Sequence, residues 1–234
     1  MKTYCLSLCC VFAMLAPCLA DAQTKGAFEG AFVSFGVART ATHIVKSNVT
    51  TVDGYFDIDQ PDANGHSLRP EIEAGYGFDL GHKFNTSINV YYRMGTATVQ
   101  DTQATHFQDT VEQSLKNQFG LYIATGYYVT DSTLFFAKLG LTTAHQTYLR
   151  ANPGVNLTPP LTEKIDLDQM VTANSFGLGV KHKFSQNHFL VLDFTKDIYP
   201  NKRIGENVNL NNIDVNIRSQ VNQETVSFRL GYNF

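Results

Sequence analysis

The sequence predicts an all-β fold, an eight-stranded antiparallel β-barrel whose strands cross a membrane. Apolar residues alternate with polar or small residues over eight segments, a pattern typical of half-buried strands. Tight turns and long polar connections alternate strictly between these segments, as in membrane barrels with short turns at one end and long loops at the other. The expected strands cover residues 27–38, 69–79, 83–97, 113–129, 133–146, 171–184, 188–198 and 218–234.

The first 22 residues are expected to be a signal peptide that precedes one barrel domain, 23–234. Lys2 gives a basic start, an apolar stretch follows, and Ala20-Asp21-Ala22 fits an A-x-A cleavage site. A lipid anchor on Cys18 is the alternative, which the bulky neighbour Pro17 disfavours.

Composition excludes several other classes of protein. All four cysteines lie within residues 1–22, so we expect no disulfide in the exported chain. The net charge of −3 offers no basic patch for nucleic acid. Beyond the signal peptide, the sequence has no run of about 20 apolar residues, which a membrane-spanning helix would need.

The connections between the expected strands fall into two classes. The tight turns are 79–82, 130–132 and 185–187. The long polar connections are 39–68, 98–112, 147–170 and 199–217. Because the two classes alternate, all tight turns meet at one end of an antiparallel barrel and all long loops meet at the other.

The two faces of each expected strand differ in a way that indicates which face meets lipid. On 113–129, Phe119 and Leu121 share one face, and Gly120 and Tyr122 share the other. The same division holds on 83–97, 133–146 and 171–184, and the last strand ends on the alternating set Val226, Phe228, Leu230, Tyr232 and Phe234. In a soluble sheet the polar face would meet water, where glycine only weakens a strand. In a narrow barrel that face points inward, where glycine makes room for long side chains.

The first expected strand, 27–38, fits this division less well than the others. Glu29 shares a face with Val33 and Phe35, so either the register of this strand is unsettled or the strand contains a bulge.

Charged side chains are expected to fill the lumen. Eight strands enclose a space just wide enough for side chains, and buried charges are stable only when paired. We therefore expect interdigitated ion pairs that serve as structural filling; an ion or proton path is the alternative. The inward charged set is Glu71, Glu73, Arg93, Lys138, Lys181, Asp193 and Arg229.

The signal peptide, the eight strands, "EIEAGYGF" at 71–78, "AKLGL" at 137–141 and the terminal Phe234 together resemble the small bacterial outer-membrane barrels, which include the OmpA transmembrane domain, OmpX and the opacity-type surface proteins. The resemblance implies a monomer in the bacterial outer membrane, in contact with membrane lipid and lipopolysaccharide. It also implies that the barrel-assembly machinery reads Phe234 as an assembly signal.

The sequence contains no clear catalytic, cofactor or metal site. Seven histidines are scattered without metal-ligand spacing. His145-Gln146-Thr147 is similar to the His-x-Ser of outer-membrane lipid A deacylases, but it has threonine in place of serine and no identifiable partner acid. We expect no enzymatic activity.

The long connections are the expected functional part. About ten tilted residues suffice to cross a membrane, yet "ENVNLNNIDVNIRSQVNQ" at 206–223 continues to alternate, so we expect a hairpin that projects outside, and the first loop could do likewise. The predicted function is non-enzymatic: adhesion to, or interaction with, a host surface or serum protein. The alternatives are a lipid A-modifying enzyme and a narrow pore.

Overall fold

The structure is a computed structural model that describes residues 26–51, 57–60, 63–101, 110–151, 165–200, 202–210 and 213–234. Its strands are β1 (Gly30–Thr51), β2 (Asp57–Gln60), β3 (Ala63–Gly81), β4 (Phe84–Asp101), β5 (Thr110–Thr130), β6 (Thr133–Ala151), β7 (Ile165–Lys183), β8 (His188–Ile198), β9 (Lys202–Leu210) and β10 (Ile213–Asn233). No helix among these residues is long and apolar enough to cross a membrane.

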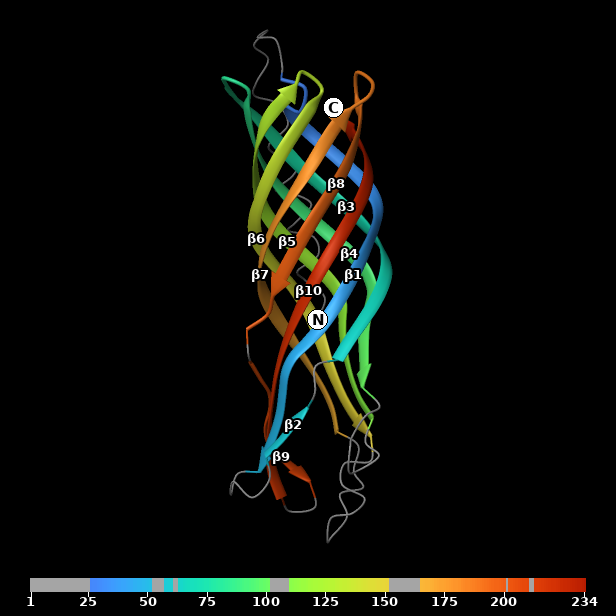
Figure 1. The fold of residues 1–234 in the computed structure, drawn as a ribbon, viewed down its shortest axis with the longest axis vertical. Coiled ribbons are helices and arrows are strands. Elements are labelled where there is room, and N and C mark those ends of the chain that lie inside the picture. Colours follow the sequence, from blue (N-terminus) through green and yellow to red (C-terminus); the bar gives the residue numbers. More distant parts are fainter. Residues whose placement is uncertain are drawn as a thin grey trace, which may run out of the picture.

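Eight of the strands close into an antiparallel barrel, which confirms the predicted fold (Figure 1). The order around the barrel is β1-β3-β4-β5-β6-β7-β8-β10, and β10 pairs back to β1. The register of β1 with β10 runs from Phe32 opposite Asn233 to Thr51 opposite Val215. Because the sheet closes on itself, no barrel strand is left with an unpaired edge inside the membrane.

The tight turns lie at the end of the barrel where the chain terminates (Figure 1). At the β3–β4 turn the backbone has positive φ at Gly81 (74°), His82 (51°) and Lys83 (71°). The carboxylate of Asp79 accepts a hydrogen bond of 2.8 Å from the Gly81 amide. A short turn of this kind reverses the chain without leaving unpaired backbone near the membrane.

The long connections are shorter than predicted, because the strands continue well beyond the expected ends. β1 runs to Thr51 rather than 38, and β3 begins at Ala63 rather than 69. The other loop-side ends show the same extension, except that of β8, which ends at Ile198 as predicted. Outside a membrane, neighbouring strands go on pairing as in any sheet, so the width of the membrane does not set the length of a strand.

At the loop end, a four-stranded sheet projects from the barrel in the order β2-β1-β10-β9. β2 pairs with β1 from Ser47 to Thr50, and β9 forms a hairpin with β10 that begins at Leu210 opposite Ile213. The expected projecting hairpin is thus confirmed. β2 and β9 are the two ends of the strand order, so each pairs on one side only.

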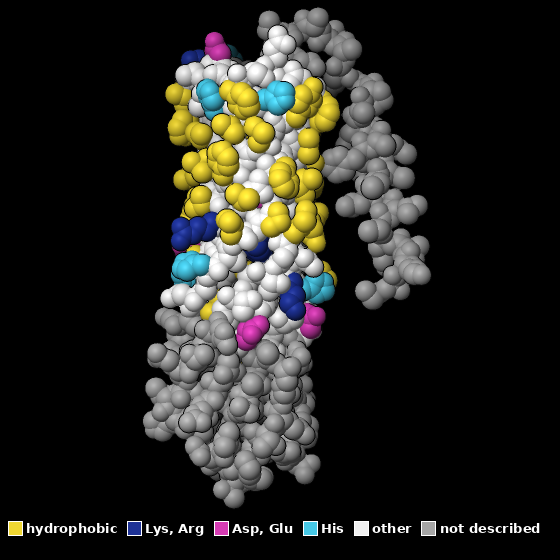
Figure 2. Space-filling model, turned by 90° about the vertical axis from the view of Figure 1, so that its right-hand side faces the viewer, with side chains coloured by type: hydrophobic (Ala, Val, Ile, Leu, Met, Phe, Trp, Pro, Cys, Tyr) yellow, Lys and Arg dark blue, Asp and Glu magenta, His cyan; other side chains and the backbone are white. Residues whose placement is uncertain are grey.

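The outward face of the barrel is an apolar band, shown in yellow in Figure 2. Leu139, Leu178 and Phe35 are 70%, 66% and 59% exposed, and such exposure is stable only against lipid. The chain has no tryptophan, and Phe, Tyr and His rings line the boundary near the tight turns. Phe84 contacts Tyr127 there, and His188 contacts Tyr232 with ring centroids 5.3 Å apart.

The first strand has a regular register once its true start is known. β1 begins at Gly30, where φ is +96°, so Glu29 precedes the strand and has no place in its alternation. Phe32 and Ser34 then face inward and Phe35 faces outward. One irregularity follows, between Ile44 and Lys46.

Candidate functional site

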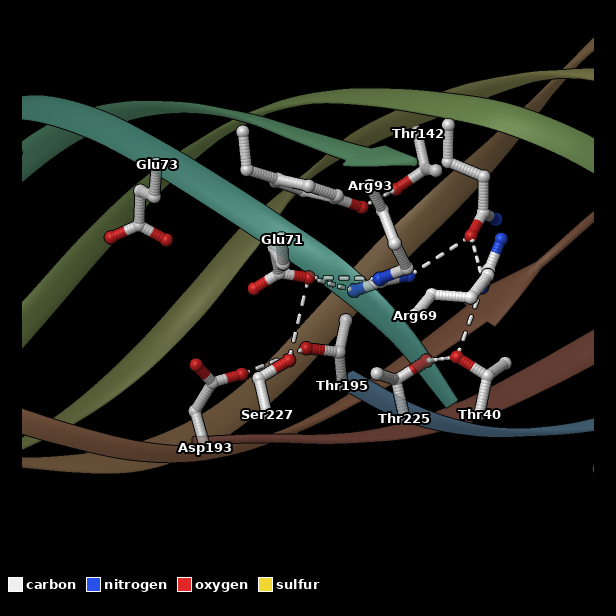
Figure 3. A network of polar contacts seen from close by, with 12 residues as sticks. Thr40, Arg69, Glu71, Glu73, Arg93, Thr142, Asp193, Thr195, Thr225 and Ser227 are labelled. Carbon is white, nitrogen blue, oxygen red and sulfur yellow. Dashed lines mark hydrogen bonds and ion pairs between the residues drawn. The ribbon is translucent and has the colours of Figure 1, made fainter. Parts of the chain in front are cut away.

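The expected charged residues gather in the middle of the lumen, where all seven are at least nine-tenths buried. Arg93 joins Glu71, its direct neighbour in the β3–β4 register, with Nη2 2.6 Å from Oε2 (Figure 3). Arg229 contacts Glu71 and Asp193, and its Nη1 lies 3.0 Å from Glu73 Oε2. These residues form one connected network, which we call the charged layer.

Ion pairs in the charged layer reach across an intervening strand at two places, over β1 and over β7, and glycine makes this reach possible. Gly36 on β1 lies opposite Glu71 on one side and opposite Arg229 on the other. A Cβ atom at Gly36 would stand 1.9 Å from the Phe228 carbonyl oxygen. The missing side chain therefore lets the Arg229 guanidinium meet the Glu71 carboxylate over β1.

The ion pair over β7 joins Lys138 on β6 to Asp193 on β8. Between them on β7 are Gly177, opposite Lys138, and Gly179, opposite Asp193. An added Cβ at Gly177 would be 2.9 Å from Lys138 Cε, and one at Gly179 would be 2.7 Å from Asp193 Cβ. The glycines on the polar face are thus part of the charge pairing.

Lys181 is the inward base that the structure places among rings. Its Nζ lies 3.9 Å from the Phe32 ring centroid, 5.0 Å from that of Phe189 and 5.4 Å from that of Phe28. Cation–π attraction of this kind offsets part of the cost of burying an ammonium group. A cavity of about 10 Å³ beside Lys181 and Glu73 has room for about one water molecule.

Sequence reasoning missed two charged members of the interior, Arg69 and Asp197, which are 2% and 0% exposed. Arg69 Nη2 donates to Thr40 Oγ1 over 3.1 Å, and Arg69 also donates to Gln118 (Figure 3). Asp197 accepts from Thr142 over 3.0 Å and lies 4.0 Å from Arg93. Both share the parity of predicted inward residues, Arg69 with Glu71 and Asp197 with Asp193, so alternation was the signal that could have found them.

Apolar layers cover the charged layer toward both ends of the barrel. Toward the tight turns, Phe28 stacks on Tyr128 and meets Phe189 edge-on with centroids 5.8 Å apart. The Phe28 amide donates to Tyr128 Oη over 3.2 Å, and Lys183 Nζ donates to the Ala27 carbonyl over 2.9 Å. This segment before β1 fills the end of the lumen, and we call it the aromatic plug.

Toward the loops, a second apolar cluster lies inside the barrel. It consists of Leu115, Ala144, Val171, Ala173, Tyr199 and Val221. Gln118 connects it to the charged layer, since its amide donates to Tyr199 Oη over 2.7 Å. Fixed ion pairs between two apolar layers favour a solid, structural interior.

The remaining sequence candidates lie on the outside of the barrel. His145 Nδ1 is 3.5 Å from Asp168 Oδ1, and both side chains are more than half exposed. Thr147 lies directly opposite Asp168 in the β6–β7 register, so the structure brings an acid to the His-x-Thr segment that sequence reasoning could not identify. No hydrogen bond joins Thr147 to His145, both of which are described. No group of three or more potential metal ligands is found within the described ranges.

Phe234 lies at the tight-turn end with its side chain 70% exposed. Its amide donates to the Ala31 carbonyl over 2.9 Å, and its ring contacts Tyr232. The ring is therefore accessible at the boundary of the apolar band.

Comparison with known protein structures finds similar folds at low sequence identity. OprG from Pseudomonas aeruginosa is 13% identical, with 89% of this chain and 98% of that one covered and a TM-score of 0.52. Ail of Yersinia pestis, in complex with the heparin analogue sucrose octasulfate, is 12% identical, with 88% and 99% covered and a TM-score of 0.41. The protease OmpT from Escherichia coli is 11% identical, with 91% and 99% covered and a TM-score of 0.48. At these identities the likeness concerns the fold alone.

A comparison with curated proteins finds no match. Residues 7–234 match the family model described as the outer membrane protein beta-barrel domain. The apolar band and the closed sheet agree with that match and with a location in the bacterial outer membrane. The chain belongs to the family of outer membrane proteins with a beta-barrel domain.

Proposed function

We propose that this protein is a non-enzymatic surface protein that uses its loop end to bind a partner outside the cell, such as a host surface or a serum protein. The observation that carries the proposal is the projecting sheet β2-β1-β10-β9, whose end strands each pair on one side only. An unpaired strand edge offers backbone N–H and C=O groups to an extended segment of another chain. Binding by strand addition is the mode that this geometry favours.

The interior supports this proposal over a narrow pore. Six of the seven predicted charged residues, all but Lys181, are held in ion pairs across the lumen, and the apolar layers at both ends offer no lining for a water-filled path. A steady large conductance of the wild-type protein in planar bilayers would contradict this interpretation.

The test replaces segments 46–60 and 202–219 with tight turns, and a control variant shortens only 102–109. Both variants should insert into the outer membrane and migrate faster on gels unheated than boiled. Cells carrying the first variant should lose binding to cultured epithelial cells and to immobilised serum proteins, whereas the control should keep it. Equal binding by both variants and the wild type would overturn the proposal.

A second candidate function, an enzyme acting on membrane lipid, is favoured by one observation. The His145–Asp168 contact of 3.5 Å gives the histidine the kind of carboxylate partner that orients a general base. Against it, the hydroxyl of Thr147 makes no contact with His145 that would activate it. If lipid A extracted from cells is altered by the wild type and left unaltered by His145→Ala, this second candidate replaces the first.

A further inference from the structure

The loop-side boundary of the apolar band carries basic side chains that the interior does not use. They lie on the outward face of β8, β1 and β3, and β10 lies between β8 and β1 in the barrel. Figure 2 shows basic, acidic and histidine side chains gathered at this end of the band. We call the set Arg39, His43, His66 and Lys196 the outer basic patch.

The strand register brings the members of the patch together. Lys196 lies opposite Glu224, Glu224 opposite Ala41, and Ala41 opposite His66. Arg39 and His43 flank Ala41 on the same face of β1. The patch therefore extends over neighbouring strands of the barrel.

Arg39 lies among apolar side chains of the band. Its neighbours in the register are Val226 and Leu68, which are 48% and 71% exposed. Arg39 is itself exposed and forms no ion pair with any other described residue. A guanidinium at the depth of an apolar surface is stable when its head reaches a polar or anionic group at the boundary.

Among the side chains that the structure describes, one acid, Glu224, faces the patch and is already engaged. Lys196 Nζ donates to Glu224 Oε1 over 2.8 Å, and His43 is paired with Asn64. Arg39 and His66 have no acidic partner within the described part of the chain. The patch is therefore left with an excess of donors and positive charge directed outward.

The opposite boundary of the band is built differently. There the contacts are between rings, Phe84 with Tyr127 and Tyr232 with both His188 and Phe234. Lys83 is exposed at that end but lies in the β3–β4 turn. The tight-turn boundary also carries the exposed histidines His82, His182 and His188, so the ring contacts are what distinguish it.

We propose that the outer basic patch binds a phosphate group of lipid A, the lipid portion of lipopolysaccharide. Lipopolysaccharide forms the outer leaflet, and its phosphates lie where acyl chains meet sugars. Arg39 and Lys196 lie at the loop-side edge of the apolar band, beside the exposed Val226 and Phe176. Arginine offers a fork of donors that matches phosphate oxygens. The inference depends on the location of the protein in the outer membrane and is independent of the projecting sheet.

The test uses the full chain, folded in a zwitterionic detergent and titrated with diphosphorylated lipid A. Native mass spectrometry measures the bound fraction. R39Q should bind about fivefold more weakly, as expected for the loss of one base near an anionic surface. K196Q should lose more than that because it also frees Glu224, and E224Q should bind more tightly than the wild type. K83Q is the matched control, and its affinity should equal that of the wild type.

Two further titrations identify the source of the phosphate. Dephosphorylated lipid A and phosphatidylglycerol should both bind more weakly than diphosphorylated lipid A. Equal affinity for diphosphorylated lipid A and either of the other two lipids would overturn the assignment, as would wild-type affinity in both R39Q and E224Q. Gel mobility without heating verifies that each variant is folded. If K196Q fails to fold, the affinities of the two single variants R39Q and E224Q test the proposal.

Discussion

The charged layer and the outer basic patch contain the same types of residue in opposite settings. In the charged layer, Arg229 and Glu71 are almost without solvent contact, and each carboxylate has cationic partners. In the patch, Lys196 and Glu224 are about one-third exposed, and water can replace either partner. An ion pair therefore matters more for the stability of the fold where water is absent around it. Mutations in the charged layer should change the free energy of unfolding more than mutations in the patch do.

The largest effect is expected from Arg229→Met, which removes the cation shared by Glu71, Glu73 and Asp193. The variant leaves buried carboxylates without a partner, which costs about 3–5 kcal/mol. The loss of stability is measured by urea unfolding in lipid vesicles, with the gel shift as the readout of folded protein. Lys196→Met is the matched exposed variant and should change stability by less than about 1 kcal/mol; a similar loss in both variants would contradict the comparison.

The second-largest loss of stability is expected from Phe28→Ala in the aromatic plug. Phe28 is 1% exposed and contacts Tyr128 and Phe189, so truncation should destabilise the barrel by about 3 kcal/mol. The same unfolding assay applies, with the exposed Phe135→Ala as control. Because lipid fills the place of an outward ring, the control should lose less, and an equal loss would mean that Phe28 is not packed as described.

A smaller effect on stability is expected from deleting Phe234, whose ring is 70% exposed. Burial against lipid is worth at most about 1.5–3 kcal/mol, so protein refolded in vitro should remain stable. In cells, insertion should fall much further if Phe234 is an assembly signal. Quantifying folded protein in outer-membrane fractions decides this, and equal insertion of deletion and wild type would remove the signal role.

The smallest effect concerns the pH dependence of the Lys196–Glu224 pair, which lies outside the apolar band. The hydrogen bond from Lys196 lowers the pKa of Glu224. A lowered pKa contributes stability that is present above the unfolded-state pKa, about 4.3, and is lost as the pH falls through the folded-state value. The loss should stay below about 0.5 kcal/mol for so exposed a pair. Comparing E224Q with the wild type at pH 7 and pH 3 measures it, and a difference that grows toward low pH would reverse the expected sign.

The alternation of apolar and polar residues predicted the strands of the barrel and the two faces of each strand, because successive side chains of any strand point to opposite faces. The inward placement of Lys138 and the outward placement of Leu139 follow directly from it. The strand ends were wrong where strands continue outside the membrane, as β1 does to Thr51, since membrane width does not limit them there.

The partners inside the lumen could not be predicted in the same way. That Arg229 meets Glu71 depends on the stagger of the strands and on the gap at Gly36. The three rings around Lys181 come from β1, β8 and the segment before β1, which no local pattern links. The acid beside His145 is likewise visible only once β6 and β7 are in register.

The gap at Gly36 has a consequence for the order in which the barrel forms. The Arg229–Glu71 contact joins residues 158 positions apart and crosses the seam where the first and last barrel strands meet. Until that seam closes, Arg229 cannot reach Glu71, so Glu71 is paired only with Arg93 and Arg229 only with Asp193, each on a neighbouring strand. Closure of the seam should therefore complete the charged layer in one step, because the Arg229–Glu71 and Arg229–Glu73 contacts can form only when β10 pairs with β1.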